Sequence, residues 1–286
     1  MESIGPVWGR DIQKHRDMVL EAYGPVLAAA PNAGVVVTRE HAYGTHPRQV
    51  LDVFRPAGAK GAPVVIFMHG GAFVRGDKRV SDEVYDNLLY WFARNGHVGV
   101  NIEFRLAPEG VWPAGADDLA GSIAWVKANI AGHGGDPDSI FVIGHSAGGT
   151  HVASHAYDPA AAYLGRDVKG VVLISARLRA DVLAENPNAA GVRAYFGADE
   201  SVYEARSPIN HAASSRLPVM IAIAEYENPL LDLYGLEFAH RIAVARRHAP
   251  RLVRMAGHNH ISIVAHFNSG EESLGREILD FFAQLK

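Results

Sequence analysis

The chain has 286 residues, of which 48% are hydrophobic, and its formal net charge is −4. This apolar fraction can fill a large core, and α/β chains of this length often fold as one unit, so we expect residues 1–286 to form a single domain. The weak negative charge argues against a nucleic-acid partner. The absence of cysteine excludes disulfides and thiolate chemistry, and we expect no cofactor.

The N-terminal sequence, MESIGPVWGRDIQKHRD, is mixed and charged, and it lacks the apolar core of a signal peptide. No apolar run reaches the roughly 18 residues that indicate a membrane span. We therefore expect a cytoplasmic protein without a membrane partner. The sequence leaves the oligomeric state open, a homo-oligomer included.

Apolar strand-like runs alternate with helical patterns along the chain. In chain order the predicted strands cover residues 49–56, 62–70, 97–108, 139–145, 168–176, 217–226 and 250–257. The predicted helices cover residues 80–96, 115–130, 147–157, 229–248 and about 261–285, and about 48 residues precede the first clear strand. This alternation is typical of an α/β fold with a mostly parallel sheet and helices on both faces. Ligands bind such sheets at the carboxyl ends of the strands.

A candidate nucleophile, Ser146, follows the predicted strand 139–145 directly. The run GHSAG at residues 144–148 fits G-x-S-x-G, which between a strand and a helix predicts a nucleophile elbow. Bulky side chains two positions before or after the serine are expected to collide with neighbouring strands. The plainer interpretation is a strand-to-helix turn capped by Ser146.

A glycine pair, Gly70 and Gly71, follows the buried strand 62–67 in the run MHGGAF. Glycines at this place let the backbone approach a ligand closely. With the amide of Ala147, their N–H groups are candidates for an oxyanion hole. A simple glycine turn is the plainer alternative.

Candidates for a base and an acid follow the last two predicted strands. His258 and His260 stand after the last one, and this order of serine, acid and histidine is that of α/β-hydrolases. For the acid, the residues alone leave Glu225, Glu227 and Asp232 open. Asn228 cannot carry the charge that stabilises an imidazolium.

With these residues placed, the sequence resembles the α/β-hydrolase superfamily, and more closely its hormone-sensitive-lipase-like branch of bacterial carboxylesterases. The resemblance extends from about residue 50 to the C-terminus. It is carried by HGGAF, FRLAPEGVWPAGADDLAGSIAWV (104–126), GGDPDSIFVIGHSAGG (134–149) and RSPINHAASSRLPVMIAIAEYENPLLD (206–232). The residues NHIS after the last strand resemble arylformamidase-like neighbours of the branch.

The resemblance implies a nucleophile at Ser146 and an oxyanion hole of Gly70, Gly71 and Ala147. The branch places its histidine three residues after a glycine, which is Gly257 here, and this implies His260 as the base.

For the acid, the branch usually has an aspartate directly before Pro-Leu, whereas this chain reads Glu227-Asn228-Pro229-Leu230. We take Glu227 as the acid and Asn228 as an inserted residue.

A second departure from the branch concerns the cap over the site. The stretches of about 1–33 and 177–206 are short for cap elements, so we expect a small or reduced cap and a preference for short acyl chains.

The resulting hypothesis is a serine carboxylesterase that acts on a small-molecule ester through a Ser-His-Glu triad. An arylformamidase-like or other amide hydrolase with the same triad is the alternative among enzymes. A non-catalytic ligand receptor on the same fold is the alternative of another class. His151 and His155 are four residues apart, but without an HExxH pattern they do not predict a metal site.

Overall fold

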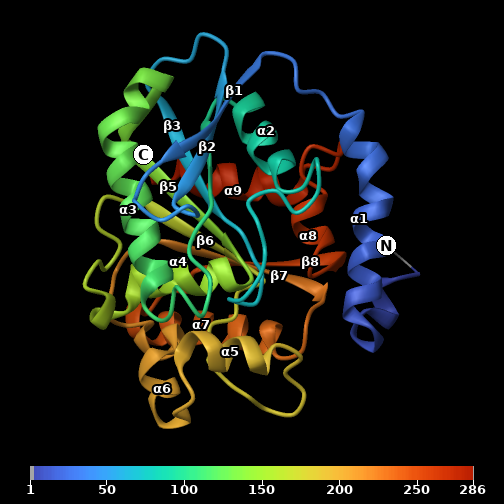
Figure 1. The fold of residues 1–286 in the computed structure, drawn as a ribbon, viewed down its shortest axis with the longest axis vertical. Coiled ribbons are helices and arrows are strands. Elements are labelled where there is room, and N and C mark those ends of the chain that lie inside the picture. Colours follow the sequence, from blue (N-terminus) through green and yellow to red (C-terminus); the bar gives the residue numbers. More distant parts are fainter. Residues whose placement is uncertain (1–2, 286) are drawn as a thin grey trace.

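The computed structural model describes residues 3–285 and shows a central sheet with helices on both faces (Figure 1). Within these residues eight strands form one sheet in the order β1-β2-β4-β3-β5-β6-β7-β8. The strands are β1 (Val35–Ala42), β2 (Val50–Pro56), β3 (Ala62–Met68), β4 (Val98–Ile102), β5 (Gly135–His145), β6 (Gly170–Ile174), β7 (Val219–Tyr226) and β8 (Arg251–Asn259). Strand β2 is antiparallel to both of its neighbours, and the remaining pairs are parallel. The prediction of a mostly parallel α/β sheet is confirmed.

The helices connect the strands and cover the sheet. They are η1 (Gly5–Arg10), α1 (Ile12–Ala28), α2 (Asp86–Arg94), α3 (Ala114–Asn129), η2 (Ile130–His133), α4 (Ala147–Tyr157), η3 (Pro159–Ala161), α5 (Ala189–Phe196), η4 (Glu200–Val202), α6 (Tyr203–Arg206), η5 (Pro208–His211), α7 (Leu231–Arg246), α8 (Ser262–Ala265) and α9 (Ser273–Ala283). Among residues 3–285, no helix combines the length and the apolar character needed to cross a membrane.

Three expectations about individual elements are wrong. Strand β1 precedes the strand that we took as the first, and it pairs with β2 at the edge of the sheet. Helix α2 begins at Asp86 rather than near residue 80, because residues 80–85 form a turn in which the Val84 carbonyl accepts hydrogen bonds from the amides of Val80 and Ser81. The C-terminal helical stretch is two helices, α8 and α9.

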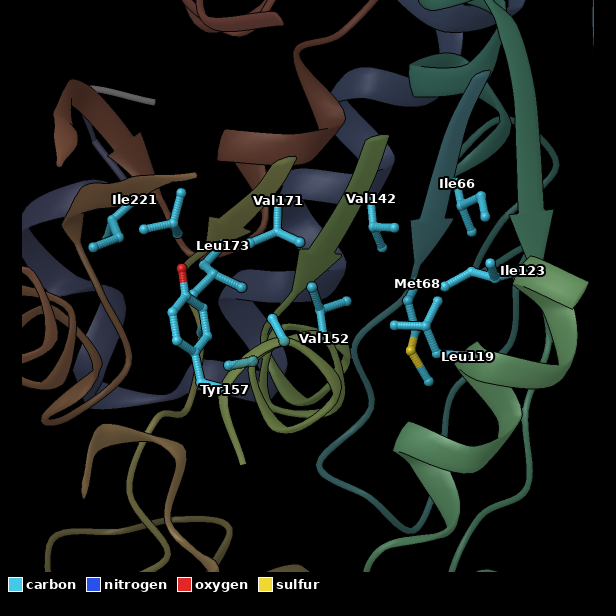
Figure 2. Packing of buried hydrophobic residues seen from close by; sticks show 14 of the residues in the cluster. Ile66, Met68, Leu119, Ile123, Val142, Val152, Tyr157, Val171, Leu173 and Ile221 are labelled. Atoms are coloured by element: carbon cyan, nitrogen blue, oxygen red, sulfur yellow. The ribbon is translucent and has the colours of Figure 1, made fainter. Parts of the chain in front are cut away.

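Alternation along each central strand divides the core into two layers. In β3, Ile66 and Met68 join the cluster that packs on α3, α4 and α7, whereas Val65 and Phe67 join the cluster that packs on α2, α8 and α9. Figure 2 shows the first layer, where side chains of β3, β5, β6 and β7 meet those of α3 and α4. The central strands are thus buried on both faces, which explains their continuous apolar sequences.

The N-terminal segment lies against the sheet edge formed by β7 and β8. Ile4, Trp8 and Val19 form a small apolar cluster with Tyr226 and Ile261. A Cβ on Gly5 would lie 2.3 Å from the Tyr226 ring, so only glycine allows this close approach. In Figure 1 helix α1 stands at the margin of the molecule beside α8. The segment therefore reaches the loops that follow β7 and β8.

Candidate active site

Ser146 occupies a sharp turn between β5 and α4. Its backbone has φ 55° and ψ −119°, and such a positive φ costs a non-glycine residue about 1–3 kcal/mol. The amide of Ser146 donates to the carbonyl of Ile174 at 3.0 Å, which ties the turn to the end of β6. The turn has the strand–turn–helix form expected of a nucleophile elbow.

Glycines on either side of Ser146 are required by close backbone contacts. A Cβ on Gly148 would lie 2.2 Å from the Met68 carbonyl oxygen at the end of β3. A Cβ on Gly144 would lie 2.7 Å from the Gly148 carbonyl oxygen. The expected collision with a neighbouring strand therefore holds for Gly148. It is wrong for Gly144, whose side chain would meet the first turn of α4 instead.

A chain of hydrogen bonds joins Ser146, His260 and Glu227. The Nδ1 atom of His260 lies 2.8 Å from Glu227 Oε2, and its Nε2 atom lies 3.1 Å from Ser146 Oγ. Because a carboxylate only accepts hydrogen bonds, Nδ1–H is the donor to Glu227. In the neutral ring Nε2 then accepts from the Ser146 hydroxyl. This is the tautomer that a base acting on the serine needs.

The Glu227 carboxylate is buried and well partnered. Its side chain is only 3% exposed, and Oε1 accepts hydrogen bonds from the Ser175 hydroxyl and from the Ala224 amide at 2.9 Å. These neutral donors compensate the burial of the charge. The end of β6 and the end of β7 thus hold the carboxylate between them.

The other acidic candidates point elsewhere or lie farther along the chain. Glu225 accepts from the Gly257 amide at 2.6 Å and pairs with Arg254 at 3.1 Å. Asp232 belongs to the first turn of α7. Of the two candidate histidines, His258 pairs with Glu271 at 2.9 Å. The structure therefore brings His260 and Glu227 to Ser146, and not these residues.

The glycine pair lies directly beside Ser146. A Cβ on Gly70 would be 2.9 Å from the Ser146 Cβ, and a Cβ on Gly71 would be 1.7 Å from the carbonyl oxygen of Arg75. Gly71 also has φ 152°, which side chains rarely allow. On the other side of the turn, Ala147 is the first residue of α4, where the amide lacks an acceptor within the helix.

Tyr85 and His145 form a support behind the site that the sequence did not reveal. His145 Nε2 lies 2.9 Å from the His260 carbonyl oxygen, so Nε2–H is the donor and Nδ1 accepts from the Tyr85 hydroxyl at 3.4 Å. Burial lowers the pKa of His145 well below its ordinary value, so the ring stays neutral. Burial raises the pKa of Tyr85 to about 12. In the sequence, His145 stood out only because it precedes Ser146 in the G-x-S-x-G pattern.

His69 links the glycine loop to Glu103 through hydrogen bonds. It is fully buried, and its ring nitrogens lie 2.7 Å from the Gly70 carbonyl oxygen and 2.8 Å from Glu103 Oε1. Burial raises the pKa of Glu103, but the hydrogen bond from His69 and the charges of His69 and Arg48 outweigh it and hold that pKa below its ordinary value. An ionised carboxylate thus anchors the loop at the end of β3.

Ser146 and His260 open into a cavity of about 270 Å³. Its walls come from the N-terminal segment, the glycine loop, the elbow and the loops after β7 and β8. They are made by Trp8, Ile12, Gln13, Arg16, Gly70, Gly71, Ala72, Arg75, Gly76, Val80, Tyr85, His145, Ser146, Pro187, Asn188, Asn228, His260 and Ile261. Both stretches expected as cap elements, about 1–33 and 177–206, therefore contribute residues to the cavity; residues 1 and 2 of the first stretch lie outside the described residues.

Asn228, the residue inserted after Glu227, is anchored to the N-terminal segment. Its Oδ1 accepts a hydrogen bond from Trp8 Nε1 at 2.9 Å, and both side chains are buried. The insertion therefore links the acid loop to η1, and Asn228 lines the same cavity as His260. In the sequence, only the position of Asn228 directly after Glu227 indicated that this residue belongs to the site.

Residues 3–285 contain no group of three or more His, Asp or Glu side chains arranged to hold a metal ion. His151 and His155 are buried within the fold. His151 is surrounded by the rings of Phe73, Phe104 and Tyr195, with centroids 4.9–5.5 Å away.

Comparisons with known proteins agree with this fold. The BD-FAE family model matches residues 51–228, which is more than half of the chain. Esterase LipC of Mycobacterium tuberculosis is 39% identical over 127 residues, covering 44% of this chain and 31% of that protein. The chain spans from about a fifth to a third of the length of the curated relatives it matches first.

Solved structures extend the similarity over nearly the whole chain. A bacterial heroin esterase matches with a TM-score of 0.73 and 24% identity, covering 97% of this chain and 93% of that one. Esterase B from Lactobacillus rhamnosis matches with a TM-score of 0.77 and 19% identity, covering 96% and 93%. The fold is therefore that of the α/β-hydrolases. Within that class, the chain belongs to the BD-FAE family.

Proposed function

We propose that this protein is a serine carboxylesterase in which Ser146 is the nucleophile, His260 the base and Glu227 the acid. The observation that carries the proposal is the hydrogen-bonded chain from the Ser146 hydroxyl through His260 to the Glu227 carboxylate. The named relatives are esterases, which supports ester hydrolysis as the reaction. A complete set of reactive groups also argues against a non-catalytic ligand receptor.

The reaction follows from the positions of these groups. His260 Nε2 removes the proton from Ser146 Oγ as that oxygen bonds to the ester carbonyl carbon. Amides of Gly70, Gly71 and Ala147 stabilise the negative oxygen of the tetrahedral intermediate. The tetrahedral intermediate then collapses. The bond between the carbonyl carbon and the alcohol oxygen breaks, and the leaving alcohol takes the proton from His260.

Water completes the cycle by the same route. It loses a proton to His260 as it bonds to the acyl carbon. The bond to Ser146 Oγ then breaks, Oγ takes that proton back from His260, and the carboxylic acid is released. Glu227 holds Nδ1–H and stabilises the imidazolium formed in each half of the reaction. His260 must be neutral to accept a proton, so activity should fall on acidification.

We propose a small ester with a short acyl chain as the substrate. The cavity of about 270 Å³ is bounded by Trp8 and Ile12 from the N-terminal segment and by Pro187 and Asn188 from the stretch 177–206. These two stretches act as a minimal cap. A cavity of this size favours a short acyl chain beside Ser146.

The proposal is tested by turnover of 4-nitrophenyl esters with two to ten acyl carbons. The Ser146→Ala variant should lose several orders of magnitude in kcat, as loss of a nucleophile does, and a fluorophosphonate should label only the parent protein. Ser154→Ala, a change elsewhere on α4, is the matched control. Residual activity of Ser146→Ala within about tenfold of the parent would contradict the assignment. A rate on an N-formyl arylamine exceeding that on 4-nitrophenyl acetate would instead indicate an amide hydrolase with the same groups.

A further inference from the structure

Two arginines line the cavity that holds Ser146. Arg16 comes from α1, and Arg75 comes from the loop after β3. Among the described residues that line this cavity, none is an aspartate or a glutamate. The whole chain has 31 acidic and 27 basic residues, so two cations without an anion depart from the average charge of the protein. The cavity therefore attracts negative charge.

Neither guanidinium group is engaged by a buried acid. Arg16 contacts Asp17, its neighbour in sequence, at 3.3 Å, and the Asp17 side chain is 60% exposed. Arg75 donates at 3.3 Å to the neutral amide of Asn188. Arg39 shows the contrast, because it bridges the buried acids Asp52 and Asp86 at 2.7 and 2.6 Å. Each guanidinium carries five N–H donors, so Arg16 and Arg75 keep donors for a ligand.

Both arginines border the reacting centre. The Arg75 amide donates to the Gly71 carbonyl at 3.0 Å, which places Arg75 on the loop that carries the proposed oxyanion donors. Arg16 lies near Tyr85. Burial raises the pKa of the Tyr85 phenol, and the positive charge of Arg16 partly offsets this rise. Tyr85 in turn contacts His145, the neighbour of Ser146. A ligand at Ser146 is thus within the field of two cations.

We propose that the substrate ester carries a carboxylate group, which Arg16 and Arg75 bind while Ser146 attacks the ester carbonyl. This inference rests on the proposed esterase function and narrows its substrate class. A guanidinium fork matches the two oxygens of a carboxylate. Because this contact does not involve the atoms of the bond that breaks, it acts mainly on substrate binding and raises kcat/KM.

The test compares esters that differ in the carboxylate. On the acyl side the pair is 4-nitrophenyl hydrogen glutarate and 4-nitrophenyl pentanoate. On the alcohol side it is 4-acetoxybenzoate and its methyl ester. After correction for spontaneous hydrolysis, kcat/KM for the anionic member of one pair should exceed that for the neutral member by about tenfold at low salt, the scale of a charge-assisted hydrogen bond. The difference should shrink at 0.5 M salt through screening.

Variants connect this preference to the two arginines. Arg16→Gln and Arg75→Gln should each lower the anionic-to-neutral ratio by about fivefold or more, and Arg16→Lys should retain part of it. Arg10→Gln is the matched control, because Arg10 is exposed on η1 and does not line the cavity. Its ratio should equal that of the parent protein.

The outcomes separate the inference from the proposed function. A ratio of one or less for both pairs, or a ratio unmoved by both glutamine variants, would overturn the carboxylate site and leave the esterase intact. If none of the esters is turned over, the esterase proposal fails. The site is then decided by calorimetry on Ser146→Ala, where 4-nitrophenyl hydrogen glutarate should bind more tightly than 4-nitrophenyl pentanoate; equal or weaker binding would overturn it.

Discussion

The loops after β5 and β7 each carry one residue of the proposed triad, but the structure holds the two loops by different means. The loop after β5 is fixed by backbone contacts close to Ser146, where Gly148 touches the end of β3 and the Ser146 amide binds the end of β6. The loop after β7 is fixed by side chains. Glu227 is held by Ser175, and Asn228 is held by Trp8, 220 residues away in the sequence.

This difference explains why the loop after β5 could be recognised from its sequence. For the loop after β7, the residues alone left several candidate acids open. A turn constrained by its own glycines has a short sequence signature. A loop constrained by distant partners can accept an inserted residue, because those partners set its position. Four predictions test this contrast, from the largest expected effect to the smallest.

The largest effect is expected for the charge of Glu227. Glu227→Gln keeps the shape of the side chain but cannot stabilise the imidazolium, so kcat should fall by about 10³–10⁴. Glu225→Gln at the end of β7 and Asp232→Asn in the first turn of α7 are matched controls on either side of Glu227, and each should stay within about threefold of the parent, as surface changes usually do. Steady-state kinetics on 4-nitrophenyl acetate measure all three. A larger loss of kcat in Asp232→Asn than in Glu227→Gln would show that the acid is Asp232, in the first turn of α7.

The second prediction concerns the steric limit at Gly148. Gly148→Ala puts a Cβ 2.2 Å from the Met68 carbonyl oxygen, and the backbone of β3 or α4 must shift. The free energy of unfolding should fall by about 3 kcal/mol or more. Urea denaturation measures it, with Gly132→Ala as the control because no atom lies within 4 Å of the Cβ it would add. Equal stability of the two variants would show that the elbow is not constrained in this way.

The third prediction measures the link between Trp8 and Asn228. Asn228→Ala leaves a buried indole N–H without its acceptor, so stability should fall by about 1–3 kcal/mol. A double-mutant cycle with Trp8→Phe should give a coupling energy of about 1 kcal/mol. kcat/KM should fall as well, because the acid loop loses its anchor. Additive effects in the cycle would show that the N-terminal segment and the acid loop are independent.

The smallest effect concerns His151, one turn beyond the elbow on α4. Burial lowers the pKa of His151 to about 3, whereas an unfolded histidine titrates near about 6.5. Between these values the unfolded chain binds a proton that the folded chain excludes. Its contribution to stability is therefore complete above about pH 6.5 and is lost progressively as the pH falls, by up to about 1.4 kcal/mol per unit.

His151→Phe keeps a ring among Phe73, Phe104 and Tyr195 and removes this proton. Between pH 6 and pH 5 the free energy of unfolding of the variant should therefore fall by about 1 kcal/mol less than that of the parent. His240→Phe on the exposed side of α7 is the control. Parallel pH profiles for His151→Phe and the parent would refute the neutral, buried histidine.

The sequence predicted most of the sheet because the central strands are buried on both faces and read as continuous apolar runs. It missed β1, an edge strand whose residues Val35–Ala42 are only partly buried and include charged side chains. It also placed the start of α2 too early, since residues 80–85 follow an apolar pattern but form a turn. Burial and turn geometry of this kind depend on neighbouring elements.

At the site, the sequence by itself determined the elbow around Ser146, the glycine pair at Gly70 and Gly71, and a histidine after the last strand. These features are local, because steric limits on a few consecutive residues define them. Only the tertiary structure decided that Glu227 rather than Glu225 faces His260, that Asn228 binds Trp8, and that two arginines border the cavity. The physical reason is distance along the chain: these contacts join β6, β7, β8 and the N-terminal segment, and side-chain packing between such elements leaves no periodic or short-range pattern in the sequence.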